Sequence, residues 1–94
     1  MNAPVMTTHA KVRAQQRGIP HTVIDWVLRY GRERHDHRGA SVYFFDKRAR
    51  RKLGSEVGGA AGRVCDEFGD VYAVVNAFGA VVTVGHRTKR LPAV

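Results

Sequence analysis

Apolar and polar residues near the start of the chain follow a helical period. Thr7 or Thr8 can cap a first helix, and the pattern extends this helix to about Arg17. Gly18 then supplies the left-handed residue that ends a helix, and Pro20 prevents it from resuming. The apolar residues of this helix are small. Its buried face is therefore thin, and the helix must pack against a neighbouring element.

The next segment is the most apolar helical stretch of the chain. The pattern predicts a second helix from Pro20 or His21 to Tyr30, and proline is well tolerated at a first helical position. Apolar side chains recur at helical spacing over residues 23–30, and Gly31 closes the segment. We expect this helix to contribute a broad apolar face to the core.

Beyond the second helix the period changes to that of β-strands. Residues 32–37 alternate but are polar, whereas residues 41–45 are rich in strand-forming side chains, with Gly39 as a turn signal between them. They predict a hairpin whose first strand is weak and lies at the sheet edge, where its charges discourage aggregation. Residues 71–76 and 80–84 are valine-rich around a short glycine-containing turn, which predicts a second, more central hairpin.

The segment between the two hairpins mixes basic residues with glycines. Residues 46–57 can form a short helix capped by Asp46, and the glycines of residues 54–62 predict a flexible loop. Neither side of that loop is long enough to fold alone, so residues 1–94 are expected to form a single domain with a loose N-terminus at residues 1–6. The predicted fold is α+β, with two N-terminal helices packed on an antiparallel sheet of about four strands in the order ααββ(α)ββ.

The chain carries a large excess of positive charge. Its 16 Lys and Arg residues against 8 Asp and Glu residues leave a net charge of +8. Such an excess attracts polyanions, among which nucleic acid is the commonest for a small domain and an acidic protein comes second. The residues predicted to bind nucleic acid are the densest cluster and a pair near the end of the chain: Lys47, Arg48, Arg50, Arg51, Lys52, Lys89 and Arg90.

Few features of the sequence indicate a membrane, a metal or a cofactor. Cys65 is the single cysteine, which excludes an internal disulfide and fits a reducing cytosol. No run approaches the roughly 18 apolar residues that span a bilayer, so we expect a cytoplasmic protein. His35 and His37 fall on one face of a strand, but zinc sites need three or four ligands, and neither a metal nor a cofactor is predicted.

Cationic and proton-carrying side chains gather near both ends of the chain. On the first predicted helix they recur at four-residue steps, which stack along one stripe: His9, Arg13 and Arg17. The last predicted strand ends in a second group: Thr83, His86 and Arg87. We predict these six residues as a catalytic site. The alternative is a solvated basic helix face.

Cleavage of RNA without a metal needs a base, an acid and cations around the phosphorane. Histidine suits the proton transfers because its ordinary pKa is about 6.5, and arginine binds phosphate oxygens through two parallel donors without losing its charge. His9 and His86 can carry the protons, and Thr83 can donate a hydrogen bond to a phosphate oxygen.

The alternation of side chains along the last strand limits this site. Thr83 and Arg87 should project to one face of the sheet. Val84 and His86 should project to the other, unless a bulge at Gly85 brings His86 round. The sequence leaves both arrangements open.

The opening motif Thr8-His9-Ala10-x-x-Arg13-x-x-x-Arg17-Gly18-Ile19 resembles the N-terminal signature of family number 4258 among the bacterial domains of unknown function. The closing Val81-Val82-Thr83-Val84 resembles that family's last strand. The resemblance implies a fold of the barnase–EndoU–RelE-like group and a small toxin-type ribonuclease held by an antitoxin. The histidine, the two arginines and the threonine of the family fall on His9, Arg13, Arg17 and Thr83, whereas His86 rests on chemistry alone.

Three functions are therefore open. The first is a metal-independent endoribonuclease of toxin type that acts on RNA. The second is a non-catalytic nucleic-acid-binding module, in which the basic cluster binds phosphates and Tyr43 and Phe44 stack on bases. The third is a domain that binds an acidic, antitoxin-like protein.

Overall fold

The structure is a computed structural model that describes residues 5–36 and 38–87. Within these residues the chain forms four helices and four strands. In chain order they are α1 (Thr8–Gln16), α2 (His21–Tyr30), β1 (Arg32–His35), β2 (Ser41–Phe44), α3 (Lys47–Val57), α4 (Ala60–Phe68), β3 (Val71–Val75) and β4 (Val81–His86). The predicted α+β class is confirmed.

The helix caps predicted from the sequence are present. Thr7 Oγ1 accepts a hydrogen bond from the Ala10 amide at 3.1 Å and caps α1, and Gly18 follows with φ 62°. Asp46 Oδ1 accepts from the Ala49 amide at 2.7 Å and caps α3. These side-chain bonds satisfy amides that the first helical turn leaves without partners.

The four strands form one antiparallel sheet in the order β1-β2-β3-β4. In the β3–β4 turn, Asn76 Oδ1 accepts from the amides of Phe78 and Ala80, both at 3.0 Å. Gly79 closes this turn with φ 85°, a conformation that favours glycine. In the β1–β2 turn, Asp36 Oδ1 likewise accepts hydrogen bonds from the amides of Arg38 and Ala40, at 2.8 Å and 2.9 Å. Both predicted hairpins are therefore confirmed.

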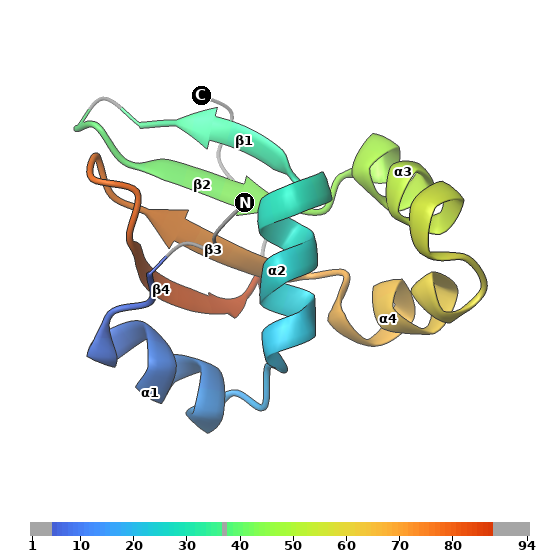
Figure 1. Cartoon of the computed structure of the whole chain (residues 1–94), viewed down its shortest axis with the longest axis horizontal. Helices are drawn as coiled ribbons and strands as arrows, with labels where there is room; N and C mark the ends of the chain where they lie inside the picture. The colour runs from blue at the N-terminus through green and yellow to red at the C-terminus, as the bar shows by residue number, and fades with distance from the viewer. Residues whose placement is uncertain (1–4, 37, 88–94) are drawn as a thin grey trace.

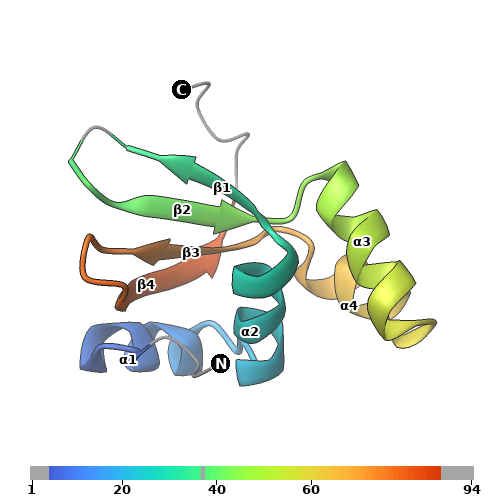
Figure 2. The same ribbon diagram turned by 45° about the horizontal axis from the view of Figure 1, so that its top comes forward.

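Two helices cover one face of the sheet, and the other two lie beyond the end of the strands. Figure 1 shows α1 beside β4 and α2 in front of the central strands, and Figure 2 shows α3 and α4 together past the strand ends. The largest fully buried side chains come from α2, α3, β3, β4 and the connection after β2: Ile24, Val27, Phe45, Leu53, Val71, Val81 and Val84. No helix in the described residues has both the length and the apolar character needed to cross a bilayer.

Residues 54–62 are not the flexible loop that their glycines suggested. Helix α3 continues through Gly54 to Val57, and α4 begins at Ala60. The turn between them is made by Gly58, which adopts φ 88°. Tertiary packing accounts for the difference, because Leu53 is fully buried and holds α3 against the core. The chain thus has one helix more than predicted between the two hairpins.

The N-terminal lead-in is also partly fixed. The Thr7 amide donates to the Val81 carbonyl at 3.0 Å, and the Val81 amide donates to the Val5 carbonyl at 2.8 Å. Met6 forms a parallel bridge with Val81. Residues 5 and 6, predicted to be loose, therefore pair with β4, and residues 1–4 lie outside the described part of the chain.

Candidate functional site

Helix α1, which carries His9 and Arg13 of the predicted stripe, lies beside the last strand. α1 packs along β4, and Ala10 and Ala14 are its buried residues. His9 is exposed at one end of α1 and Arg13 is half-buried. Arg17 follows the other end, eight positions after His9, which corresponds to roughly 12 Å along the helix axis.

The register of β4 separates Thr83 from His86. Thr83 pairs with Val74, whereas His86 pairs with Val71. Residues opposite each other share a face of a sheet, so His86 lies with Val71 on the face that the helices cover and Thr83 lies on the other. The irregularity in the β3–β4 pairing falls between Val74 and Val75, and no bulge at Gly85 turns His86 round.

His86 already has a partner for each ring nitrogen. Nδ1 lies 2.8 Å from Asp70 Oδ1, and Nε2 lies 3.3 Å from the Arg17 carbonyl oxygen. The ring also stacks on Phe68, with the centroids 6.4 Å apart. The imidazole therefore ties the end of α1 to the ends of α4 and β4.

Arg87 is also held by hydrogen bonds to the backbone of neighbouring segments. Its Nη2 lies 3.3 Å from the Phe45 carbonyl oxygen and 3.4 Å from that of Gly69, and its guanidinium lies 5.3 Å from the centre of the Phe44 ring. The six residues predicted as a catalytic site thus occupy different places: His9 at the outer end of α1, Thr83 on the opposite face of the sheet, and His86 and Arg87 inside hydrogen-bonded junctions.

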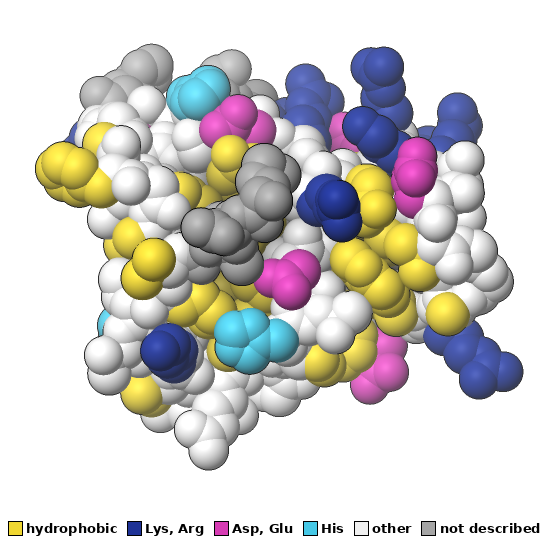
Figure 3. All heavy atoms as spheres, in the orientation of Figure 1, with side chains coloured by type: hydrophobic (Ala, Val, Ile, Leu, Met, Phe, Trp, Pro, Cys, Tyr) yellow, Lys and Arg dark blue, Asp and Glu magenta, His cyan; other side chains and the backbone are white. Residues whose placement is uncertain are grey.

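A second site, the α2–α3 cleft, lies between the end of α2 and the first half of α3. Its volume is about 750 Å³, and its lining comes from two segments, residues 30–32 and 46–52: Tyr30, Gly31, Arg32, Asp46, Arg48, Ala49, Arg51 and Lys52. Figure 3 shows the Lys and Arg side chains gathered over this corner of the molecule. Part of the basic cluster predicted from the sequence therefore faces a concave surface.

Helix α3 divides the basic cluster between its faces. Ala49 and Leu53 are buried, one helical turn apart, and they fix which side of α3 meets the core. The cations on the cleft side are Arg48, Arg51 and Lys52. In the described part of the chain, no hydrogen bond or ion pair engages these three side chains.

The other predicted nucleic-acid-binding residues lie elsewhere. Arg50 Nη2 donates to the Gly69 carbonyl at 3.2 Å and joins α3 to the end of α4. Lys47 is exposed and does not line the cleft. Lys89 and Arg90 fall outside the described residues.

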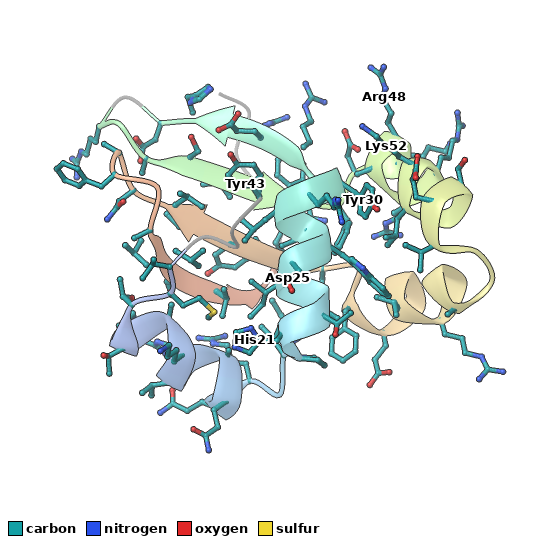
Figure 4. All side chains as sticks on the ribbon, viewed as in Figure 1. His21, Asp25, Tyr30, Tyr43, Arg48 and Lys52 are labelled. Atoms are coloured by element: carbon teal, nitrogen blue, oxygen red, sulfur yellow. The ribbon has the colours of Figure 1, made fainter. Side chains whose placement is uncertain are left out.

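The opposite wall of the cleft supplies an aromatic ring. Tyr30 is half-buried at the end of α2, and Figure 4 shows it beside Lys52, with Arg48 extending outward from α3. The Arg29 guanidinium lies 5.9 Å from the centre of the Tyr30 ring. A side chain at Gly31 would collide with the Val27 and Phe44 carbonyls, so glycine lets the end of α2 approach β2 and sets this wall.

The cleft also contains one ion pair. Arg32 Nη1 lies 3.6 Å from Asp46 Oδ2, while Asp46 Oδ1 caps α3. Sequence reasoning missed Tyr30, Arg32 and Asp46 as site residues. The signal was the predicted hairpin, because pairing of Arg32 with Phe44 places the start of β1 next to the start of α3.

Positive charge predominates at the start of α3, beside the cleft. The first turn of α3 carries Lys47 and Arg48 and no acidic residue. The amino end of a helix is itself a partial positive charge, so these cations lie at its unfavourable end. The lining as a whole carries four cations against one carboxylate, Asp46, so the cleft is positively charged.

The two aromatic residues predicted to stack on bases are engaged elsewhere. Phe44 is 5% exposed, and the guanidinium groups of Arg34 and Arg87 lie 5.4 Å and 5.3 Å from the centre of its ring. The Tyr43 hydroxyl donates to Glu33 Oε2 at 2.7 Å, and its ring packs against the core. Tyr30 is the aromatic residue that lines the cleft with these cations.

A polar cluster joins β1 to β2 on the face that carries Tyr43. Ser41 Oγ lies 3.0 Å from His35 Nδ1, and His35 Nε2 lies 3.7 Å from Glu33 Oε1. The pKa of Glu33 is lowered, most strongly by the hydrogen bond from Tyr43 and next by a hydrogen bond from Ser41. The pKa of Tyr43 is raised to about 12, mainly by burial and secondly by its hydrogen bond to Glu33.

The sequence also raised His35 and His37 as metal ligands. His37 lies outside the described residues, and among those described no three His, Cys, Asp or Glu side chains gather as metal ligands would.

Comparison with known proteins finds no relative. No family model matches the chain, no curated protein matches it, and no solved structure matches it. The resemblance of the opening motif to a family therefore stays a prediction, and the site must be interpreted from its own geometry.

Proposed function

We propose that this protein binds single-stranded RNA in the α2–α3 cleft. The observation that carries the proposal is the meeting of three unengaged cations, Arg48, Arg51 and Lys52, with the ring of Tyr30 across one concavity. Phosphates supply the anions that the cations lack, and an unpaired base supplies a flat face for the ring.

The dimensions of the cleft favour a single strand over a duplex. A volume of about 750 Å³ lies in the range of sites that hold one small ligand, which corresponds to one or two nucleotides. Stacking on Tyr30 further requires a base that is out of a helix. The two arginines and the lysine along one side of α3 supply donors that bind phosphate oxygens of such a strand.

The proposal predicts a salt-dependent affinity that depends on the cleft cations. Fluorescence anisotropy with a labelled uridine hexanucleotide should give a plot of log K against log salt with a slope of about −0.7 per phosphate contact, or about −2 for three contacts. Lys52→Ala should weaken binding on the order of fivefold at low salt and flatten the slope by about 0.7.

Lys11→Ala is the matched control. It removes the same charge from an exposed position on α1, which does not line the cleft. It should therefore leave the affinity within about twofold of the unmodified protein, because distant exposed charges are screened. Equal losses in the two variants would mean that net charge alone attracts RNA, and the cleft would then have no special role.

The endoribonuclease hypothesis stays a prediction with its own test. α1 and β4 do lie side by side, but His9 and His86 stand at opposite ends of α1. If the protein cuts RNA in EDTA and His9→Ala slows the cutting by about 100-fold, catalysis is supported. RNA left intact at high protein concentration argues for binding alone. Association with an acidic partner protein also stays a prediction, tested by co-elution at low salt.

A further inference from the structure

One carboxylate lies among the cations of the α2–α3 cleft. Asp46 uses Oδ1 to cap α3, through the Ala49 amide at 2.7 Å. Its Oδ2 lies 3.6 Å from Arg32 Nη1, beyond hydrogen-bond distance, and accepts no hydrogen bond from the described residues. The side chain is 25% exposed. Asp46 Oδ2 can therefore accept a hydrogen bond from a ligand, whereas the other charged side chains that line the cleft are all hydrogen-bond donors.

This combination of groups selects among the bases. An ionised carboxylate only accepts, so the base beside it must offer N–H groups. Guanine carries two adjacent N–H donors on its Watson–Crick edge, and its O6 and N7 accept from arginine or lysine. Uracil has one N–H between two carbonyl oxygens, which would face the carboxylate and repel it. Adenine and cytosine offer one amino group beside a ring nitrogen that only accepts.

We propose that the α2–α3 cleft prefers guanine and that Asp46 is the residue that recognises it. The inference rests on the proposed binding of single-stranded RNA. In this arrangement the guanine ring stacks on Tyr30 while Asp46 accepts from its N1–H and amino groups. A cleft cation such as Lys52 or Arg48 donates to O6.

The test compares hexanucleotides that differ at one base. Anisotropy is measured with a uridine hexamer, with the same hexamer carrying one central guanosine, and with inosine in place of that guanosine. The guanosine hexamer should bind on the order of tenfold tighter than the uridine hexamer. Inosine lacks the amino group and should fall between the two.

Two variants locate the preference. Asp46→Asn still caps α3, because asparagine is as good a cap as aspartate, so it should fold with the same helix content. It should reduce the guanosine-to-uridine ratio from about ten to near one, since the amide adds donors that face those of guanine. Asp25→Asn makes the same charge change on the exposed side of α2, outside the cleft lining (Figure 4), and should keep the ratio.

The outcomes separate this inference from the function on which it rests. Equal, salt-dependent binding of all three hexamers would overturn guanine preference and leave RNA binding intact. A ratio that persists in Asp46→Asn would overturn the role of Asp46. No binding of any hexamer would overturn RNA binding and guanine preference together.

Discussion

Tyr43 and Glu33 link the first two strands through one hydrogen bond between a phenol and a carboxylate, 2.7 Å long. Burial raises the pKa of Tyr43 to about 12, so the hydroxyl remains a donor throughout the neutral range. The same bond lowers the pKa of Glu33 below its ordinary value of 4.5. Because the folded state favours the charged carboxylate, the stabilisation is present above pH 4.5 and is lost as the pH falls through the lowered pKa.

Tyr43→Phe should therefore destabilise the protein at pH 7 but hardly at pH 3. Glu33 is 38% exposed, so solvent screening limits the expected loss to about 0.5–1 kcal/mol in the free energy of unfolding. Urea titrations at the two pH values measure it. Tyr30→Phe, which removes a hydroxyl without a hydrogen-bond partner among the described residues, should change little at either pH. A loss for Tyr43→Phe that is equal at both pH values would show that the bond to charged Glu33 is not its cause.

Polar side chains near the end of β4 have partners that their residue types do not reveal. His86 and Arg87 carry the groups that phosphate chemistry requires, yet Asp70, Gly69 and Phe45 hold them in structural hydrogen bonds. These partners come from segments that are distant in sequence. The residue type indicates what a side chain can do, whereas its tertiary partners decide whether it is available.

At the scale of elements, glycines in and after α3 have opposite roles. Gly54 lies inside the helix, whereas Gly58 adopts φ 88° at its end. A Cβ atom at either position would meet nothing within 4 Å, so only the backbone distinguishes them. Gly54→Ala should raise the free energy of unfolding by roughly 0.5–1 kcal/mol. Gly58→Ala should lower it by about 1 kcal/mol, because alanine disfavours a left-handed conformation.

Thermal or denaturant unfolding of the two alanine variants measures both changes. If both raise stability, then Gly58 does not need its positive φ and α3 can continue beyond Val57. If both lower it, then Gly54 is not in a regular helix. Either result would contradict the division of residues 47–68 into α3 and α4.

Periodicity predicted most elements because each of them buries one face. The helical spacing of residues 23–30 and the valine-rich strands of the second hairpin are direct consequences of that burial. The prediction was wrong at residues 54–62, where the glycines indicated a loop. Here Leu53 on one side and Val64 and Phe68 on the other pack against the core and stabilise helices that local preference disfavours.

At the scale of the whole molecule, the site depends on topology. The cleft joins the end of α2 and the start of β1 to the start of α3, and the β1–β2 hairpin brings these segments together. The sequence identified the basic cluster but could not show that Arg50 donates to Gly69 while Arg48 and Lys52 line the cleft together with Tyr30. That division follows from the burial of Ala49 and Leu53, which only the packed structure reveals.

The most direct test of RNA binding in the α2–α3 cleft is an NMR titration of ¹⁵N-labelled protein with the uridine hexamer. The largest amide shift changes should fall on Gly31, Arg32 and the first two turns of α3, including Arg48 and Lys52. Shift changes concentrated on α1 and the end of β4, or the absence of any change at concentrations where RNA is in excess, would contradict the account.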